Sequence, residues 1–405
     1  MVWVLALLGV VGLFFLDVRY VQAWQTGLAA LAADGRFDLV VRECERGLAS
    51  RRPFLLVLRH FVMPGVMETV AALYCHQAGE NERSLELATE AERRARPGPL
   101  RNAATSTRAM AQYGLGRLAE ARAAFEELHA LPDVQAGLLC PGALVALSEC
   151  RFEDAIALCS EILEREPADE SAHLLKSTAL TALGRFGEAF KALDYEPRGS
   201  RAFYAPRDLK LMDSDSGSIA LLNEQERERA GIVRPSPLLQ SAEIASLSGD
   251  WQATRVYLEW SRDRLGRNPT ILFNFHVLMA RCLAHEGDAR GAEAQLRLAD
   301  TAALSLPKNQ SLQWEREVAH ARVALELSRL DDALAALSRA EPLARSPAQR
   351  RWSAFWTARS LEAAQRFPEA ITRYRALTEA NLADWPHAEA RQALARLTSM
   401  TSSAS

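Results

Sequence analysis

The chain has 405 residues, a formal net charge of −3, and hydrophobic and charged fractions of 49% and 24%. This length exceeds one ordinary compact domain, so several domains or one extended array are expected, and the balanced charge argues against nucleic acid as a partner. Ala, Leu, Glu and Arg dominate the composition, which favours an all-α fold.

The first segment of the chain is uniformly apolar. Residues 1–16 read MVWVLALLGVVGLFFL and carry no charge. Continued as a helix to Tyr20, the segment would be about 30 Å long at 1.5 Å per residue, which is enough to cross a bilayer core. Trp3 lies at one end, and Tyr20 and Trp24 lie at the other, as in the aromatic belts of membrane-spanning helices. The sequence therefore predicts a transmembrane or signal-anchor helix over residues 1–21, with residues 1–20 in contact with the membrane.

Two alternatives to a permanent anchor stay open. Residues 21–23 (VQA) form an acceptable cleavage site for a signal peptide, although the basic N-terminal region of such peptides is missing. A buried first helix is the other alternative, although the segment lacks an amphipathic pattern.

The charges around this segment indicate its orientation. No cation precedes it, and the first cations after it are Arg19, Arg36, Arg42 and Arg46. The positive-inside rule then places the large C-terminal part in the cytoplasm. The predicted location is the bacterial inner (cytoplasmic) membrane with a single pass, and a periplasmic location is the alternative.

A short motif recurs along the rest of the chain. It has the form Gly-Arg-Phe at residues 35–37 and 184–186, and related triplets occur seven more times. Its first residue stands at positions 35, 79, 116, 150, 184, 249, 287, 328 and 365. Successive turn positions are separated by 34 to 44 residues, except for one spacing of 65. Such a period indicates repeated helix–turn–helix units. Because Gly readily takes the positive φ that ends a helix, we expect the turn of each unit at this residue.

Two positions around the turns carry small residues. Five residues after the turn residue stand Ala121, Ala155, Ala189, Ala292, Ala333 and Ala370. Seven residues before it stand Ala72, Ala109, Ala143, Ser177, Ala242, Ala280, Ala321 and Ala358. Small side chains on both helices of a hairpin let the two helix axes approach closely.

This pattern resembles the tetratricopeptide repeat (TPR) family over nearly all of residues 22–386, most clearly over residues 136–167 and 350–377. The first-helix Trp of the family is present in place only as Trp24, and Ala or Ser replaces its close-packing Gly. The resemblance implies about nine helical hairpins stacked into a right-handed superhelix, an α-solenoid whose concave groove binds other proteins.

One interruption divides the predicted array. Residues 197–237 account for the long spacing and are interpreted as an insertion or degenerate repeat, with a short helix over 219–230. An N-terminal solenoid of about five repeats is expected over residues 22–196. A C-terminal solenoid of about four repeats is expected over residues 238–397, ending in a capping helix over 387–397. Residues 398–405 are predicted to be a disordered tail.

The resemblance also suggests a binding surface. In TPR proteins the residue six before the turn tends to face the ligand, and in the last three repeats it is Arg281, Arg322 and Arg359. Four residues earlier stand Val277, Val318 and Phe355, and His285 lies one turn after Arg281. These residues predict a partner protein or peptide that is acidic and partly apolar. Because nearly every cation of this chain is Arg, a chance run of arginines is the competing interpretation.

No pattern for catalysis, a cofactor or a metal is present. The six cysteines form no C-x-x-C pair, which favours buried thiols in a reducing compartment, and residues 213–217 (DSDSG) lack the rest of a calcium loop. Nucleophile-elbow, zinc-protease, phosphate-loop and dinucleotide motifs are missing. The sequence predicts no enzyme, no cofactor and no small-molecule substrate, but a membrane-tethered protein–protein interaction scaffold or adaptor. The alternative is an exported periplasmic TPR assembly factor with a cleaved signal peptide.

Overall fold

The computed structural model describes residues 21–403, except 22, 33–35, 51–63, 132–133, 194–234, 264, 267, 307–309 and 380–383. Within these ranges every regular element is a helix. The predicted membrane segment, residues 1–20, lies outside them, as does the predicted short helix over 219–230. Of the helices that are described, none combines the length and the apolar character needed to cross a bilayer.

The chain divides into two compact units. Of the described residues, those between 21 and 145 together with 305–306 form one unit, and those between 146 and 304 together with 310–403 form the other. The division falls inside α8 (Cys140–Ser148), whereas the sequence predicts an interruption at residues 197–237.

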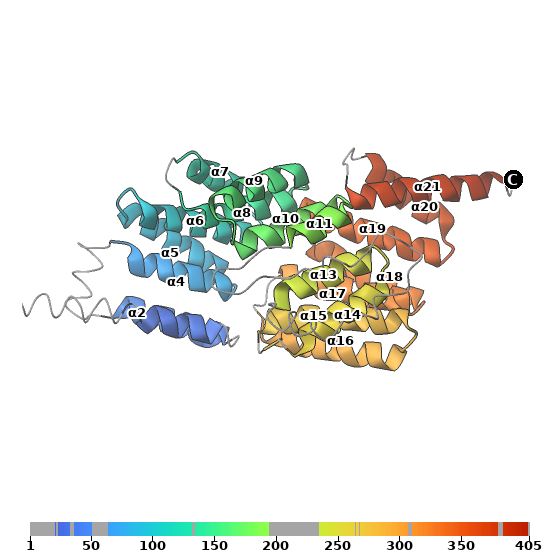
Figure 1. The fold of residues 1–405 in the computed structure, drawn as a ribbon, viewed down its shortest axis with the longest axis horizontal. Coiled ribbons are helices and arrows are strands. Elements are labelled where there is room, and N and C mark those ends of the chain that lie inside the picture. Colours follow the sequence, from blue (N-terminus) through green and yellow to red (C-terminus); the bar gives the residue numbers. More distant parts are fainter. Residues whose placement is uncertain are drawn as a thin grey trace, which may run out of the picture. The chain divides into compact units, whose positions relative to one another are not determined.

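The first unit consists of consecutive helical hairpins (Figure 1). Residues 23–32 are helical, and the helices that follow are α2 (Phe37–Ala49), α4 (Val66–Gln77), α5 (Asn81–Arg94), α6 (Pro99–Gly114), α7 (Leu118–His129) and the short η2 (Ala136–Leu139). Trp24 is buried in its core, where its indole Nε1 donates to the carbonyl of Glu43 at 3.0 Å. A Cβ added to Gly47 would lie only 2.5 Å from this ring, so Gly47 allows the indole to lie against α2.

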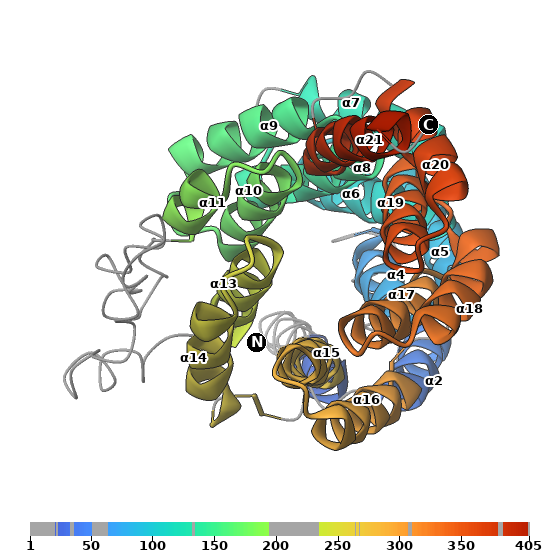
Figure 2. The ribbon, with the colours of Figure 1, turned by 90° about the vertical axis from the view of Figure 1, so that its right-hand side faces the viewer.

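The second unit continues the same pattern, with an inner and an outer helix in each hairpin. Figure 2 shows α13, α15, α17 and α19 on the inner side of this unit, and α14, α16, α18 and α20 outside them. Its helices are α9 (Phe152–Arg165), α10 (Glu170–Ala182), α11 (Phe186–Ala192), α13 (Pro235–Leu247), α14 (Trp251–Arg262), α15 (Pro269–His285), α16 (Ala289–Leu304), α17 (Gln310–Glu326), α18 (Leu330–Ala340), η4 (Glu341–Leu343), α19 (Pro347–Ala363), α20 (Phe367–Glu379) and α21 (Trp385–Ser403).

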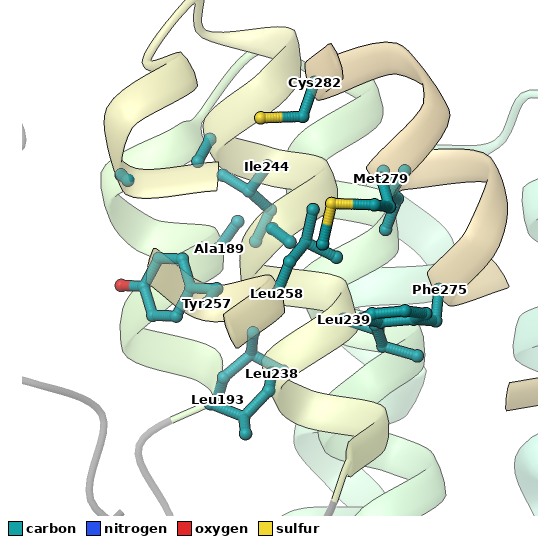
Figure 3. Packing of buried hydrophobic residues seen from close by; sticks show 14 of the residues in the cluster. Ala189, Leu193, Leu238, Leu239, Ile244, Tyr257, Leu258, Phe275, Met279 and Cys282 are labelled. Atoms are coloured by element: carbon teal, nitrogen blue, oxygen red, sulfur yellow. The ribbon is translucent and has the colours of Figure 1, made fainter. Parts of the chain in front are cut away.

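The helices on either side of residues 194–234 share one hydrophobic core. Leu193, at the end of α11, packs with Leu238 of α13, and Tyr257 of α14 and Met279 of α15 belong to the same cluster (Figure 3). Burial of large apolar side chains from four helices stabilises this part of the stack across the interruption.

The turns confirm the predicted repeat. The backbone takes a positive φ at Gly79, Gly116, Gly184, Gly249 and Gly287, and also at Cys150 (62°), Ser328 (57°) and Gln365 (58°), where Gly is replaced. At each of these turns the amide of the next residue donates to the carbonyl four residues before the turn residue, as Arg366 donates to Leu361 at 2.9 Å. This bond closes the first helix of the hairpin in the Schellman motif. The ninth turn residue, Gly35, lies outside the described residues.

The small residues of the repeat lie where the helices meet. All six alanines that follow the turns are fully buried, and the eight small residues that precede the turns are at most 2% exposed. In the three repeats without Ala at the position five residues after the turn residue, the residues there are equally buried: Val40, Ser84 and Thr254. The prediction of close helix pairing at these two positions is confirmed.

The last helix differs from the prediction. The sequence predicts a capping helix that ends at Leu397 and a disordered tail over 398–405, but α21 continues to Ser403. The Thr398 hydroxyl donates to the carbonyl of Leu394 at 2.7 Å, and the Ser399 hydroxyl donates to that of Arg396. These side chains satisfy carbonyls of the last turns instead of ending the helix.

The second unit also brings its last helix to its first ones. Helix α21 contacts α10. At the turn after α10, a Cβ on Gly184 would lie 3.2 Å from Cδ1 of Trp385. Ala348 of α19 packs against the small cluster of Cys150, Phe152 and Ala182.

Candidate functional site

The four C-terminal inner helices present one charged residue each at the same repeat position. This position, six residues before the turn, is occupied by Glu243 of α13, Arg281 of α15, Arg322 of α17 and Arg359 of α19. The repeat pattern predicts the three arginines as site residues. The same register one repeat earlier holds Glu243, the acidic member of the series, which that prediction missed.

Glu243 joins the first two of these arginines. Its Oε2 accepts a hydrogen bond from Nη1 of Arg281 at 3.1 Å, and its Oε1 accepts from Nη1 and Nη2 of Arg322 at 3.0 and 3.1 Å. Nη1 of Arg281 also donates to the Ser246 hydroxyl at 3.0 Å. We call Glu243, Ser246, Arg281 and Arg322 the arginine–glutamate cluster.

Aromatic rings lie beside the guanidinium groups. The guanidinium carbon of Arg281 lies 5.3 Å from the ring centroid of Trp251, and that of Arg322 lies 4.8 Å from that of Trp356. Rings at this distance attract a cation through their quadrupole. Each arginine is therefore oriented by an aromatic ring as well as by the carboxylate.

The cluster is largely withdrawn from solvent. The side chains of Arg281, Arg322 and Glu243 are 3%, 14% and 28% exposed. Burial and the nearby Arg322 lower the pKa of Arg281 to about 9, so it stays protonated at neutral pH. Burial acts to raise the pKa of Glu243, but the two guanidinium groups outweigh it, and the net shift is downward. The carboxylate is therefore held ionised between two cations.

The arginines offer more donors than Glu243 can accept. The Nε atoms of Arg281 and Arg322 are both buried and have no hydrogen-bond acceptor among the described residues. Buried donors of native proteins are nearly always satisfied by protein, water or ligand. The cluster can therefore accommodate a further acceptor.

Arg359 is the open member of the row. Its side chain is exposed, and its guanidinium carbon lies 6.0 Å from the ring centroid of Phe355. No carboxylate pairs with it within the part of the chain that the structure describes. It is the arginine of this row most accessible to a partner.

The apolar residues named with the arginines lie deeper. Phe355 is fully buried, Val318 is 7% exposed, and Val277 is half-buried. Phe355 and Val318 belong to the core that joins α17, α19 and α21, and not to an open surface. Their apolar character is explained by packing between repeats.

His285 lies at the end of α15 and does not contact the cluster carboxylate. Its ring stacks on Trp251, with a centroid distance of 4.6 Å, and its Nδ1 lies 3.6 Å from Oε2 of Glu326. The structure thus relates His285 to Arg281 through their shared contact with the Trp251 ring.

The first unit has no charge at the same position. Leu73 of α4, 40% exposed, and the half-buried Met110 of α6 and Leu144 of α8 stand there. Thr178 of α10 holds the position in the first inner helix of the second unit. Charge at this position is thus concentrated between α13 and α19.

The described residues contain no group of three or more side chains arranged to hold a metal ion. Five of the six cysteines are buried, and burial raises the pKa of Cys159 to about 12 and those of Cys150 and Cys282 to about 11. Such thiols are protonated at neutral pH and are poor nucleophiles.

Comparison with known proteins gives information on the fold alone. No protein-family profile matches this chain, and no curated protein sequence is similar to it. Among solved structures, a Rap protein complexed with Competence and Sporulation Factor superposes with a TM-score of 0.53 at 14% identity, covering 94% of this chain and 99% of that one. This chain therefore shares the TPR-like fold of that structure.

Two further structures superpose less well. A tetratricopeptide repeat protein from Parabacteroides merdae ATCC 43184 has a TM-score of 0.43 at 12% identity, covering 73% of this chain and 98% of that one. The APC/C hetero-tetramer Cut9–Hcn1 has a chain with a TM-score of 0.45 at 13% identity, covering 92% and 54%.

Proposed function

We propose that this protein is a protein–protein interaction scaffold whose second unit binds an acidic, partly apolar segment of a partner. The observation that carries the proposal is the row of arginines on consecutive inner helices, of which Arg322 already binds a carboxylate with two hydrogen bonds and Arg359 is exposed, with no carboxylate beside it among the described residues. Paired N–H donors of this kind match the geometry of a carboxylate.

The partner is a protein segment in this proposal. Trp356 beside Arg322 and Phe355 beside Arg359 are buried rings that hold the cations in place. The half-buried Val277 is the apolar residue of this set that a partner side chain can reach. The Rap protein of the comparison was solved with a bound factor, which supports a separate binding partner for a stack of this fold. The stack as an extended surface, and not a catalytic centre, is the functional element.

A peptide-binding measurement tests the proposal. The probe is a fluorescein-labelled dodecapeptide of alternating glutamate and leucine, titrated with the full chain and followed by fluorescence anisotropy. We expect saturable binding that weakens about tenfold in Arg359→Glu, because an attraction becomes a repulsion. Arg375→Glu is the matched control, since Arg375 is an exposed arginine on the outer helix α20. Equal weakening in both variants, or no binding by the unaltered chain, would refute the proposal.

We further propose that residues 1–20 hold the scaffold at the inner membrane, with both units in the cytoplasm. Their uncharged apolar sequence and the arginines that follow support this. Carbonate extraction of membranes should leave the full chain in the pellet and release a variant lacking residues 2–20. An alkaline phosphatase fused to the C-terminus should be inactive.

The export alternative has its own observable. A mature chain that begins at Trp24, measured by intact-mass spectrometry, would establish cleavage of a signal peptide and a periplasmic scaffold. An active phosphatase fusion with an uncleaved N-terminus would instead reverse the proposed orientation.

A further inference from the structure

Glu243 binds the arginines as a partner's carboxylate would. Its Oε1 accepts hydrogen bonds from both terminal nitrogens of Arg322, and its Oε2 accepts one from Nη1 of Arg281. We propose that Glu243 is a built-in competitor, which occupies the carboxylate site of the second unit and is replaced by an acidic side chain of the partner. This inference rests on the proposed function, because it names how the same site is regulated.

The exposure of the three side chains decides which of them can exchange. Glu243 is 28% exposed and Arg322 is 14% exposed, while Arg281 is 3% exposed and is held by Ser246 and Trp251. Solvent therefore reaches part of the Glu243 and Arg322 side chains and almost none of Arg281. Exchange replaces the carboxylate and leaves the buried guanidinium of Arg281 in place.

The two cations of the cluster outnumber its one carboxylate. Two guanidinium groups share one carboxylate, and both of their buried Nε atoms have no acceptor in the described part of the chain. Glu326 acts on Arg281 electrostatically, but its contact is with His285. A buried charge is stabilised only when it is paired and hydrogen-bonded. An entering carboxylate takes the two terminal nitrogens of Arg322, and Glu326 remains an electrostatic partner of Arg281.

The exchange changes how the helices are joined. Glu243 on α13 bridges to α17, two repeats further along, and Arg322 is 79 positions away in the sequence. When a partner carboxylate takes Arg322, this link between α13 and α17 is broken. The partner segment that fits carries a glutamate or aspartate that reaches Arg322, whose guanidinium is held by the buried Trp356 ring.

The test uses the full chain and the glutamate–leucine dodecapeptide. We expect Glu243→Gln to bind it at least about tenfold more tightly than the unaltered chain, because a competitor that fills the site lowers the apparent affinity by the fraction of free site. Glu317→Gln is the matched control: Glu317 is also 28% exposed and also bonds an arginine, Arg339, but lies outside the cluster. Its affinity should not change.

Each outcome decides a separate point. If the unaltered chain binds the peptide and Glu243→Gln binds it equally or more weakly, the competitor is refuted and the proposed function stands. If neither binds, the proposed function fails, and the competitor fails with it. If circular dichroism shows that Glu243→Gln does not fold, the peptide is titrated into Glu243→Asp instead. This variant keeps the negative charge, but its shorter side chain reaches Arg322 less well. It should bind more tightly than the unaltered chain, and equal or weaker binding overturns the inference.

Discussion

The carboxylate of Glu243 accepts two hydrogen bonds from Arg322, at 3.0 and 3.1 Å, although the two residues are 79 positions apart. Between them along the stack lies α15, whose Arg281 bonds the other oxygen of the same carboxylate. One acidic side chain thus ties three inner helices together. Its removal is therefore expected to affect stability as well as the proposed binding.

Glu243→Ala should destabilise the second unit by about 3–5 kcal/mol, because it leaves the nearly fully buried Arg281 without its counter-charge. Urea unfolding followed by circular dichroism measures this loss. The control Glu317→Ala breaks a pair in which Arg339 is 59% exposed, and it should cost less than about 1 kcal/mol. Equal losses in the two variants would show that the cluster adds nothing beyond a surface ion pair.

The contacts of Glu243 with the two arginines predict that stability depends on pH. Burial raises the pKa of Glu243, but the two arginines lower it by more. The pKa of Glu243 in the folded protein therefore lies below the ordinary glutamate value of about 4.3. A carboxylate whose pKa is lower in the folded than in the unfolded protein contributes its full stabilisation of the fold above the unfolded-state pKa. This contribution is lost as the pH falls through the folded-state pKa. The stability difference between the unaltered chain and Glu243→Gln should therefore be constant near neutral pH and shrink below about pH 4. A difference that grows on acidification would contradict the lowered pKa.

The turns predict substitutions that stabilise. Ser328 and Gln365 are exposed residues at φ 57° and 58°, where Gly has no steric penalty. Ser328→Gly and Gln365→Gly should each raise the free energy of unfolding by up to about 1 kcal/mol. Cys150→Gly should not, because the Cys150 side chain is buried in a small cluster and its packing is lost. Chemical unfolding of the three variants measures these differences.

The reverse change separates backbone strain from crowding. Gly249 has φ 85°, and no neighbouring atom lies within 4 Å of the place that a Cβ would take, whereas a Cβ on Gly184 would meet Trp385. Gly184→Ala should therefore lower the melting temperature more than Gly249→Ala. Equal shifts would indicate that contact with Trp385 contributes nothing.

The small repeat position predicts an asymmetry within one helix. Ala333 of α18 is fully buried against the first helix of its hairpin, while Ala335 is exposed. Ala333→Leu should cost about 1–3 kcal/mol through overpacking, and Ala335→Leu should be nearly neutral. Thermal unfolding of both variants measures the difference, and a tolerated Ala333→Leu would contradict close pairing there.

Much of the fold was predictable from local pattern. The turn residues were identifiable by their spacing even where Cys150, Ser328 and Gln365 replace Gly, because the Schellman turn depends on backbone geometry that several residue types can adopt at some cost. The buried alanines followed from the same register. The extension of α21 to Ser403 was missed, since the hydroxyls of Thr398 and Ser399 can either end a helix or bond back to it.

The sequence by itself determined the all-helical repeat, the turn positions and the residues at which paired helices touch, because each depends on contacts within about 40 residues of the chain. Only the tertiary structure decided the state of the arginines. Whether Arg281, Arg322 and Arg359 are open depends on what neighbouring repeats place beside them. Glu243 lies one repeat from Arg281 and two repeats from Arg322. The ion pairs between them are therefore set by the packing between hairpins, which local spacing does not encode.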